Sequence, residues 1–492
     1  MRGNALLPRS TPSAEGLRPE AVAAFIDDAA AYGIELHSLM IIKNGRVATE
    51  GWWHPYAPEL LHGCYSVTKT FTGSAIGFAI DEGLLSLTDR LCDFFPDRLP
   101  ENPSENLLAI TVHDLLCMGC GDEVELDITD APYDIRAFMA TDFIHKPGTA
   151  FHYNSLCSHM LAQIIFKLTG QSLPEYLEPR LLEPLGISGI RWDKAPQGLE
   201  MGGWGIHIKT EDLAKMGLLY LQHGRWEGRQ VLPAGWAKTA SSQKIDNSPT
   251  GDTPEYVSGY CYQLWRGVVS NSYRLEGAYG QFSIILPDQN AVVAVTQATL
   301  KTEITHELIR RHLIPGMSDG SLPVSQAQEI LAEKLRNLTL NESAVAACSP
   351  LEGAIGGKTY VFKENSFSLV PESERLMAFE RNCGIRSAAL SFDGDICTFT
   401  WREGDRETRV AVGLDGCYRE TSTQLSFVRQ PIRAVGRWAD DSTFRFVMRA
   451  IEEPHASLIS LMFQEDEVVL SFVEAMASHD PQNIRMLIGH RA

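Results

Sequence analysis

The sequence predicts a mixed α+β fold, in which an antiparallel sheet flanked by helices is followed by a β-rich C-terminal domain. Three observations predict this fold. A strand hairpin precedes a long helical region, strands return before residue 300, and short β-type runs dominate from about residue 353 onward. The chain of 492 residues also exceeds what one hydrophobic core usually serves. We therefore expect two domains, one of them large.

The N-terminal elements begin with a predicted helix over residues 19–32, which has a proline in its first turn and a glycine after its end. Strand-like runs at 36–42 and 47–52 flank Asn44-Gly45, a dipeptide that favours a tight hairpin turn. A helix predicted over 65–82 follows. It is apolar on nearly every side, which indicates that it is buried.

The rest of the first domain follows the same patterns. Capping and stop residues predict helices at 111–118, 155–168, 211–222 and 303–313. Apolar or alternating runs predict strands at 260–268, 281–286 and 291–297. Because strands lie on both sides of the helical region, we expect one sheet built from both ends of the domain.

A turn-rich stretch at 314–320 marks the predicted domain boundary. The first domain then covers 1–320, a linker with a helix covers 321–345, and the β-rich domain covers 346–492. The short β-type runs of this last part suggest a small barrel or a sandwich.

Composition and charge limit the possible partners and the compartment. The net charge of -19, without a basic patch, argues against nucleic-acid and anionic-membrane partners. There is no apolar run of the kind that a signal sequence or a membrane span requires, so we expect a soluble, cytoplasmic protein. Ten scattered cysteines agree with a reducing compartment.

The segment from Ser66 to Lys69 has the S-x-x-K spacing, which places a hydroxyl and an ammonium one helical turn apart on the same face. A serine hydroxyl becomes a good nucleophile only when a neighbouring base accepts its proton. A lysine in a desolvated pocket can be that base, provided that burial lowers its pKa from about 10.4. The spacing therefore makes Ser66 the candidate nucleophile and Lys69 its candidate base.

The same spacing recurs from Ser241 to Lys244, so spacing alone is weak evidence. Ser66 begins a strongly apolar helix directly after a hairpin, whereas Ser241 lies in a polar stretch that we expect at the surface. The alternative for Ser66 is a purely structural role as a helix cap, because serine is a favoured residue at helix N-termini.

Residues 147–155 read Pro-Gly-Thr-Ala-Phe-His-Tyr-Asn-Ser. This stretch favours a catalytic role for Ser66 over a helix-capping role. It resembles the loop that carries the catalytic tyrosine in class C beta-lactamases, family VIII esterases and 6-aminohexanoate-dimer hydrolases. The Y-x-N or Y-x-S element of these enzymes matches Tyr153 and Ser155, and the resemblance covers about residues 20–315. It implies a beta-lactamase/transpeptidase-like fold, in which the Tyr153 phenol relays protons beside the Ser-Lys pair.

The resemblance also implies a third element, a strand with K-T-G or a variant, whose position residues 278–281 occupy here. By this match the backbone N–H groups of Ser66 and Gln281 form the oxyanion hole, and Gly280 permits the close approach.

Two departures from the family pattern bear on the substrate. Ala278 stands at the position of the lysine of K-T-G, and Ser155 at that of the asparagine of Y-x-N. Because the missing lysine recognises a substrate carboxylate, its loss favours neutral or differently charged esters and amides over beta-lactams.

Two other sequence motifs are weaker evidence for a functional site. A G-x-S-x-G match at 316–320 follows a helix instead of a strand, so it does not form a nucleophile elbow. The C-x-x-C match at 117–120 has no second ligand pair at a matching spacing. We therefore predict no metal site and no cofactor.

The predicted function is that of a serine hydrolase, most similar to the esterases, acting through an acyl-enzyme on a small-molecule ester or amide. The alternatives are a D-amino-acid peptidase or amide hydrolase, a beta-lactamase, a sensor that is acylated without turnover, and a non-catalytic relative. The C-terminal domain loosely resembles lipocalin-like barrels through residues 357–360 and 436–441. The sequence determines neither the oligomeric state nor the role of this domain.

Overall fold

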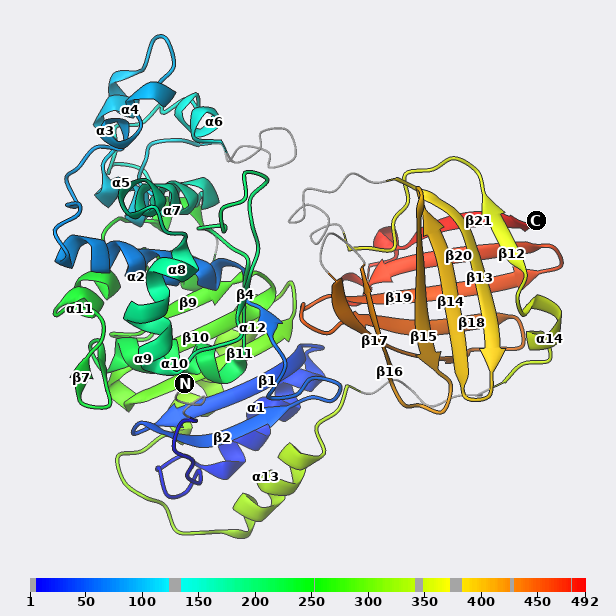
Figure 1. Cartoon of the computed structure of the whole chain (residues 1–492). Coiled ribbons are helices and arrows are strands. Elements are labelled where there is room, and N and C mark those ends of the chain that lie inside the picture. The colour runs from blue at the N-terminus through cyan, green and yellow to red at the C-terminus, as the bar shows by residue number, and fades with distance from the viewer. Residues whose placement is uncertain are drawn as a thin grey trace. The chain divides into compact units, whose positions relative to one another are not determined.

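The computed structural model describes residues 6–123, 134–251, 253–340, 348–371, 383–424, 429–478 and 480–492. The chain divides into two compact units (Figure 1). The first unit comprises Met1–Trp53 and Ala57–Leu338, and the second comprises His54–Tyr56 and Thr339–Ala492.

A six-stranded antiparallel sheet forms the centre of the first unit, with the strand order β2-β1-β11-β10-β9-β8. Its strands are β1 (Glu35–Lys43), β2 (Arg46–Trp52), β8 (Trp265–Arg266), β9 (Tyr273–Gly277), β10 (Gln281–Leu286) and β11 (Ala291–Ala298). Strand β1, from the start of the domain, pairs with β11, from its end. The predicted fold class, an antiparallel sheet flanked by helices and built from both ends of its domain, is therefore confirmed.

Helices cover this sheet. Helix α1 (Pro19–Ala31) packs against β1, and α10 (Thr210–Leu221) packs against β1, β10 and β11. The predicted helix over 65–82 is a 3₁₀ turn (Tyr65–Val67) followed by α2 (Thr68–Asp81). Every residue of α2 from Thr68 to Ala79 is buried, as its apolar composition predicts.

The remaining elements of this unit are short, apart from α7 and α13. The helices are α3 (Leu91–Phe94), α4 (Glu105–Ala109), α5 (Val112–Cys117), α6 (Ile135–Met139), α7 (Ser155–Thr169), α8 (Leu173–Leu177), α9 (Glu183–Leu185), α11 (Trp236–Ser241), α12 (Thr302–Leu308) and α13 (Gln326–Arg336). The strands are β3 (His62–Gly63), β4 (Arg191–Trp192), β5 (Ile206–Ile208), β6 (Arg225–Trp226) and β7 (Arg229–Gln230).

The strand predicted over 260–268 is wrong in extent, because regular pairing covers only β8. Gln263 has a positive φ of 58°, which breaks an extended run. Strand β9 was not predicted, since the two charged residues of Tyr-Arg-Leu-Glu-Gly do not suggest a buried strand. All five of its residues are nevertheless buried.

The second unit is a β-barrel, which confirms the predicted β-rich C-terminal domain. Nine strands close in the order β15-β14-β13-β12-β21-β20-β19-β18-β17, and a short pairing of β17 with β15 completes the ring. The tenth strand, β16, pairs with β17. Large apolar side chains such as Trp401, Trp438 and Phe444 fill the core.

The elements of this unit are α14 (Glu352–Ile355), β12 (Thr359–Phe362), β13 (Ile385–Asp393), β14 (Ile396–Glu403), β15 (Arg406–Gly413), β16 (Arg419–Gln424), β17 (Arg429–Trp438), β18 (Thr443–Ala450), β19 (Ala456–Gln464), β20 (Glu467–Glu474) and β21 (Arg485–Arg491).

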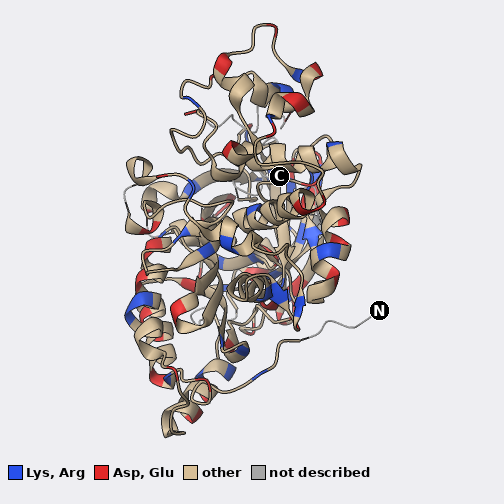
Figure 2. Cartoon of the chain, turned by 90° about the vertical axis from the view of Figure 1, so that its left-hand side faces the viewer, with Lys and Arg blue, Asp and Glu red and all other residues tan. Residues whose placement is uncertain are grey.

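Within the described ranges, none of the helices combines the length and the apolar character that spanning a membrane requires. Figure 2 shows Lys and Arg interspersed with Asp and Glu along the ribbon.

Candidate active site

Ser66 and Lys69 lie where the chain turns from β3 into α2. Ser66 is half-buried in the 3₁₀ turn, and Lys69 is almost completely buried in the first turn of the helix. The Lys69 Nζ donates a hydrogen bond to the Ser66 Oγ over 2.9 Å. The predicted contact between the hydroxyl and the amine is therefore present.

Lys69 has two further hydrogen-bond acceptors. Its Nζ also donates to the Ser155 Oγ at 3.2 Å and to the carbonyl oxygen of Gly203 at 2.7 Å. Gly203 can approach this closely only because it lacks a side chain, since a Cβ there would lie 2.7 Å from the carbonyl oxygen of Ser155. The three acceptors fix the amine beside the Ser66 hydroxyl.

Tyr153 covers the same amine. The Lys69 Nζ lies 4.8 Å from the centroid of the Tyr153 ring, and this ring stacks on Trp265 with 5.2 Å between centroids. The fold thus brings together Ser66, Lys69, Tyr153 and Ser155, which come from two segments far apart in the sequence.

Asp122 holds the backbone around Tyr153. Its Oδ2 accepts hydrogen bonds from the Asn154 Nδ2 at 2.6 Å and from the His152 Nδ1 at 2.8 Å. The Asn154 Oδ1 accepts from the N–H of Leu156 and so caps α7. Both sequence neighbours of Tyr153 are therefore tied to one carboxylate, and this fixes the position of the tyrosine.

A cleft of about 580 Å³ opens in front of Ser66. Aromatic and polar side chains both contribute to its wall. The residues that line it are Ser66, Phe151, His152, Tyr153, Thr250, Gly251, Tyr256, Trp265, Glu276, Gly277, Ala278 and Thr302. The cleft is large enough for a small organic substrate.

The end of β9 lies against the turn that precedes Ser66. A Cβ on Gly277 would lie 2.1 Å from the carbonyl oxygen of Cys64, so only glycine fits at this position. Together with Ala278, Gly277 lines the cleft. The backbone that faces the candidate nucleophile is thus the end of β9.

Gly280 and Gln281, predicted from the family resemblance, do not line the cleft. Gly280 packs against the side chain of Gln297. The buried Gln281 amide donates to the carbonyl oxygens of Ala278 and Gln297, at 3.2 and 2.8 Å. A turn at Ala278–Gly280, with Tyr279 at a φ of 62°, separates β9 from β10.

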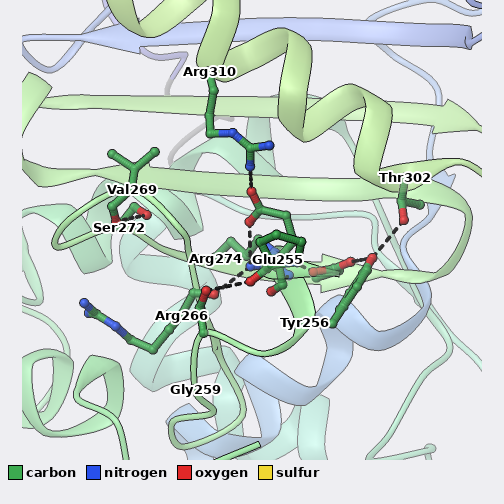
Figure 3. A network of polar contacts seen from close by, with 12 residues as sticks. Glu255, Tyr256, Gly259, Arg266, Val269, Ser272, Arg274, Thr302 and Arg310 are labelled. Atoms are coloured by element: carbon green, nitrogen blue, oxygen red, sulfur yellow. Dashed lines mark hydrogen bonds and ion pairs between the residues drawn. The ribbon is translucent and has the colours of Figure 1, made fainter. Parts of the chain in front are cut away.

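A network of polar contacts (Figure 3) includes three residues that line the cleft, Tyr256, Glu276 and Thr302. The Glu276 carboxylate accepts from the Tyr256 hydroxyl and from the Arg274 Nε, both at 2.5 Å. The Tyr256 hydroxyl also contacts the Thr302 hydroxyl at 2.8 Å. Glu255 pairs with Arg310. Burial, and then the Glu276 carboxylate, raise the pKa of Tyr256, so its phenol stays protonated.

Three residues of the cleft wall were not predicted as site residues from the sequence: Tyr256, Trp265 and Glu276. The alternation in Tyr-Arg-Leu-Glu-Gly was the available signal for Glu276, because it puts arginine and glutamate on one face of a strand. Tyr256 and Trp265 lie outside long regular elements, and no local pattern marked them as parts of a cleft.

Comparisons with known proteins agree with the fold. Residues 22–313 match the Beta-lactamase family. Protein flp of Staphylococcus aureus strain MW2 is 30% identical over 316 residues, a match that covers 55% of this chain and 61% of that protein. The chain thus spans less than two thirds of the length of this relative.

Solved structures are similar at lower sequence identity. A candidate beta-lactamase from Bacteroides dorei is 15% identical with a TM-score of 0.51, and the match covers 60% of this chain and 99% of that one. A candidate 6-aminohexanoate-dimer hydrolase from Bacillus anthracis is 19% identical with a TM-score of 0.49, covering 68% and 86%. The first of these similarities supports the same fold for the first unit.

Proposed function

The chain belongs to the beta-lactamase family, and we propose that it is a serine hydrolase that cleaves small uncharged esters through an acyl-enzyme on Ser66. One observation carries this proposal. The buried Lys69 Nζ contacts the hydroxyls of both Ser66 and Ser155 beneath the ring of Tyr153, at the edge of a cleft.

In the proposed reaction the Ser66 Oγ attacks the ester carbonyl, and a proton passes to the Lys69 amine in its neutral form. The transfer is direct or runs through the Tyr153 hydroxyl, which accepts the Ser66 proton as it gives its own to the amine. The new bond joins Oγ to the carbonyl carbon. When the bond to the leaving oxygen breaks, the same proton is delivered to the departing alcohol. Water then attacks the acyl-enzyme, which releases the acid and restores the Ser66 hydroxyl.

The negative charge on the tetrahedral intermediate requires backbone donors. We assign this role to the N–H groups of Ser66 and Ala278. The support is the contact of Gly277 with Cys64, which brings the end of β9 beside the nucleophile. Ala278 replaces Gln281 in this proposal, because Gln281 lies outside the cleft.

The preference for uncharged substrates rests on the charges of the cleft. Glu276 is an acidic group on its wall, and among the described residues that line the cleft there is no lysine or arginine. A substrate carboxylate would therefore find Glu276 on the wall but no lysine or arginine free to bind it, because Arg274 already pairs with Glu276. This supports an ester substrate over a beta-lactam, which carries a carboxylate.

Glu276 also favours a second candidate function, the hydrolysis of amides that carry a free amino group. A substrate ammonium would be attracted to the Glu276 carboxylate and to the faces of the neighbouring aromatic rings. Faster turnover of amino-acid amides than of simple aryl esters would identify this activity.

The test is intact-protein mass spectrometry after incubation with a fluorophosphonate probe, together with turnover of p-nitrophenyl butyrate. Wild type and Ser241→Ala should be labelled at one site and should hydrolyse the ester, whereas Ser66→Ala should do neither. Labelling without turnover would replace the hydrolase by an acylated sensor. Equal labelling of wild type and Ser66→Ala would show that Ser66 is not the nucleophile.

A further inference from the structure

Three buried side chains form a cluster of metal-ligating groups outside the cleft, namely Cys120, Asp122 and Cys157. Each is at most 1% exposed. The two sulfur atoms lie 3.4 Å apart, and one ligand atom from each residue lies within 4.8 Å of the others. Sulfur and carboxylate ligands at this spacing can meet at one cation after small side-chain shifts.

Among the described residues, the Asp122 carboxylate has hydrogen-bond partners on one oxygen only. Its Oδ2 accepts both hydrogen bonds, from His152 and Asn154, whereas its buried Oδ1 accepts none from the described part of the chain. A buried carboxylate oxygen without a donor is strongly unfavourable. A cation beside the two sulfur atoms would remove this penalty, and the two bonds to Oδ2 would orient the carboxylate toward it.

We propose that Cys120, Asp122 and Cys157 bind one zinc ion or a cation of similar softness. Thiolate ligands select zinc over magnesium or calcium. Binding consumes one divalent cation and releases the two thiol protons, which leaves a complex of two thiolates and one carboxylate. A water molecule or a backbone carbonyl completes the four-coordinate shell that zinc prefers.

The site connects two segments that determine the geometry of the cleft. Cys120 and Asp122 follow α5, while Cys157 lies in the first turn of α7, two residues after Ser155. An ion here would fix the loop after α5 to the segment that carries Tyr153 and Ser155. The ion is a structural support and takes no part in the proposed reaction.

This proposal revises the sequence-based expectation of no metal site. The C-x-x-C motif was set aside because it had no second ligand pair. In the folded chain its first cysteine, Cys117, is not part of the cluster; its sulfur lies 3.7 Å from the carbonyl oxygen of Asp114. The fold instead brings Cys157, 37 residues away, to Cys120.

The experiment measures zinc per chain by mass spectrometry of the elements. The full-length protein is stripped with a chelator under reducing conditions, reloaded with zinc alone and passed over a desalting column. Wild type and the matched control Cys117→Ser should retain about one zinc per chain, and Cys157→Ser and Asp122→Asn less than about a tenth of that. Reloading with cobalt should give a thiolate charge-transfer band that is absent in Cys157→Ser.

Three outcomes would overturn the proposal. The first is wild-type protein that retains no zinc, a result that does not depend on how the variants fold. The second is equal zinc in wild type and Cys157→Ser. The third is a disulfide between Cys120 and Cys157, detected as a mass about two units lower that reduction reverses, in a protein that binds no zinc after reduction. This result would assign the close sulfur atoms to a redox pair.

Discussion

Two segments of this chain carry Ser-x-x-Lys, and both place a lysine over a tyrosine ring. The Lys69 Nζ lies 4.8 Å from the centroid of Tyr153, and the Lys244 Nζ lies 4.6 Å from that of Tyr262. Each lysine also bonds to a serine hydroxyl. Lys69 reaches the serine three residues before it at 2.9 Å, whereas Lys244 reaches Ser242 at 2.8 Å.

The two segments differ in the secondary structure that follows each serine. Ser66 leads into α2, so the helical turn brings Lys69 back over it. Ser241 is the last residue of α11, and the chain continues extended, so Lys244 cannot reach it in the same way. The same four-residue spacing therefore pairs the lysine with the first serine of the motif in one segment and with the residue after it in the other.

The surroundings of the two pairs differ even more. Lys69 is 2% exposed and bonds to Ser155 and Gly203 as well, whereas Lys244 pairs with an exposed serine. Burial lowers the pKa of Lys244. A serine, a lysine with a lowered pKa and a tyrosine are thus not sufficient for a site. The first segment also has a cleft and a strand end beside its serine.

The largest expected effect comes from replacing each of the two lysines by methionine and comparing the losses of activity. Lys69→Met should lower kcat/KM for p-nitrophenyl butyrate by about 10³-fold, because the Ser66 proton loses its acceptor. Lys244→Met should change it less than about twofold, since this lysine does not line the cleft at Ser66. Steady-state kinetics of both variants at one pH measure the contrast. Similar losses in the two variants would contradict the assignment of the active segment.

The second comparison replaces each of the two tyrosines by phenylalanine. Tyr153→Phe should lower kcat by about 10²-fold, within the range for loss of a proton-transfer group. Tyr262→Phe is the matched control, although it removes a 2.5 Å contact with His113 and should lower stability. Rates are therefore compared per folded molecule, with the folded fraction taken from circular dichroism. If Tyr153→Phe keeps full activity, Lys69 alone handles the protons.

The fold could be predicted to a large extent, because its signals are local. The apolar surface of 65–82 and the Asn44-Gly45 turn each determine their own element. The barrel could be predicted as a β-rich domain from its short strands, but its closure depends on the pairing of β15 with β17, which no local pattern records.

The candidate site could be predicted only in part. Ser66 and Lys69 share one helical turn, so their contact follows from spacing. Tyr153 and Ser155 required the family resemblance, since 86 residues separate Lys69 from Ser155. The role of Gly280 and Gln281 stays a prediction, because a turn of three residues separates β9 from β10 and the sequence does not show which side of that turn meets Ser66.

The third prediction concerns stability around the first segment, which is built on buried polar groups. His159 is fully buried on α7, and its Nδ1 accepts the N–H of Gly202, next to the Gly203 that holds Lys69. Burial lowers the pKa of His159 to about 4. An unfolded histidine titrates near 6.5, so between pH 6.5 and 4 the unfolded chain binds a proton that the folded chain does not.

His159 therefore contributes stability that is complete above pH 6.5 and is lost as the pH falls toward 4. The free energy of unfolding should drop by about 2 kcal/mol from this group between pH 7.5 and 5. Urea unfolding of wild type and His159→Gln at both pH values isolates the contribution, because the other titrating groups cancel in the difference. Equal drops in the two proteins would show that His159 is not buried in neutral form.

The smallest effect tests the charge of the cleft. Glu276→Gln should raise kcat/KM for an ester with a carboxylate, such as p-nitrophenyl hemisuccinate, by about 5- to 10-fold relative to p-nitrophenyl butyrate, because one nearby repulsion is removed. Asp246→Asn makes the same change of charge at the exposed side chain of Asp246, close to the second segment in sequence, where solvent screens it. It should leave the ratio of the two esters unchanged.

This last comparison separates two explanations of the cleft. If only Glu276→Gln shifts the ratio, the carboxylate on β9 acts directly on the substrate. If both variants shift it equally, the net charge of -19 repels anionic substrates as a whole, and the cleft has no selectivity of its own. Neither result depends on the identity of the nucleophile, because both esters would use the same one. The substrate preference can therefore fail while the serine hydrolase assignment stands.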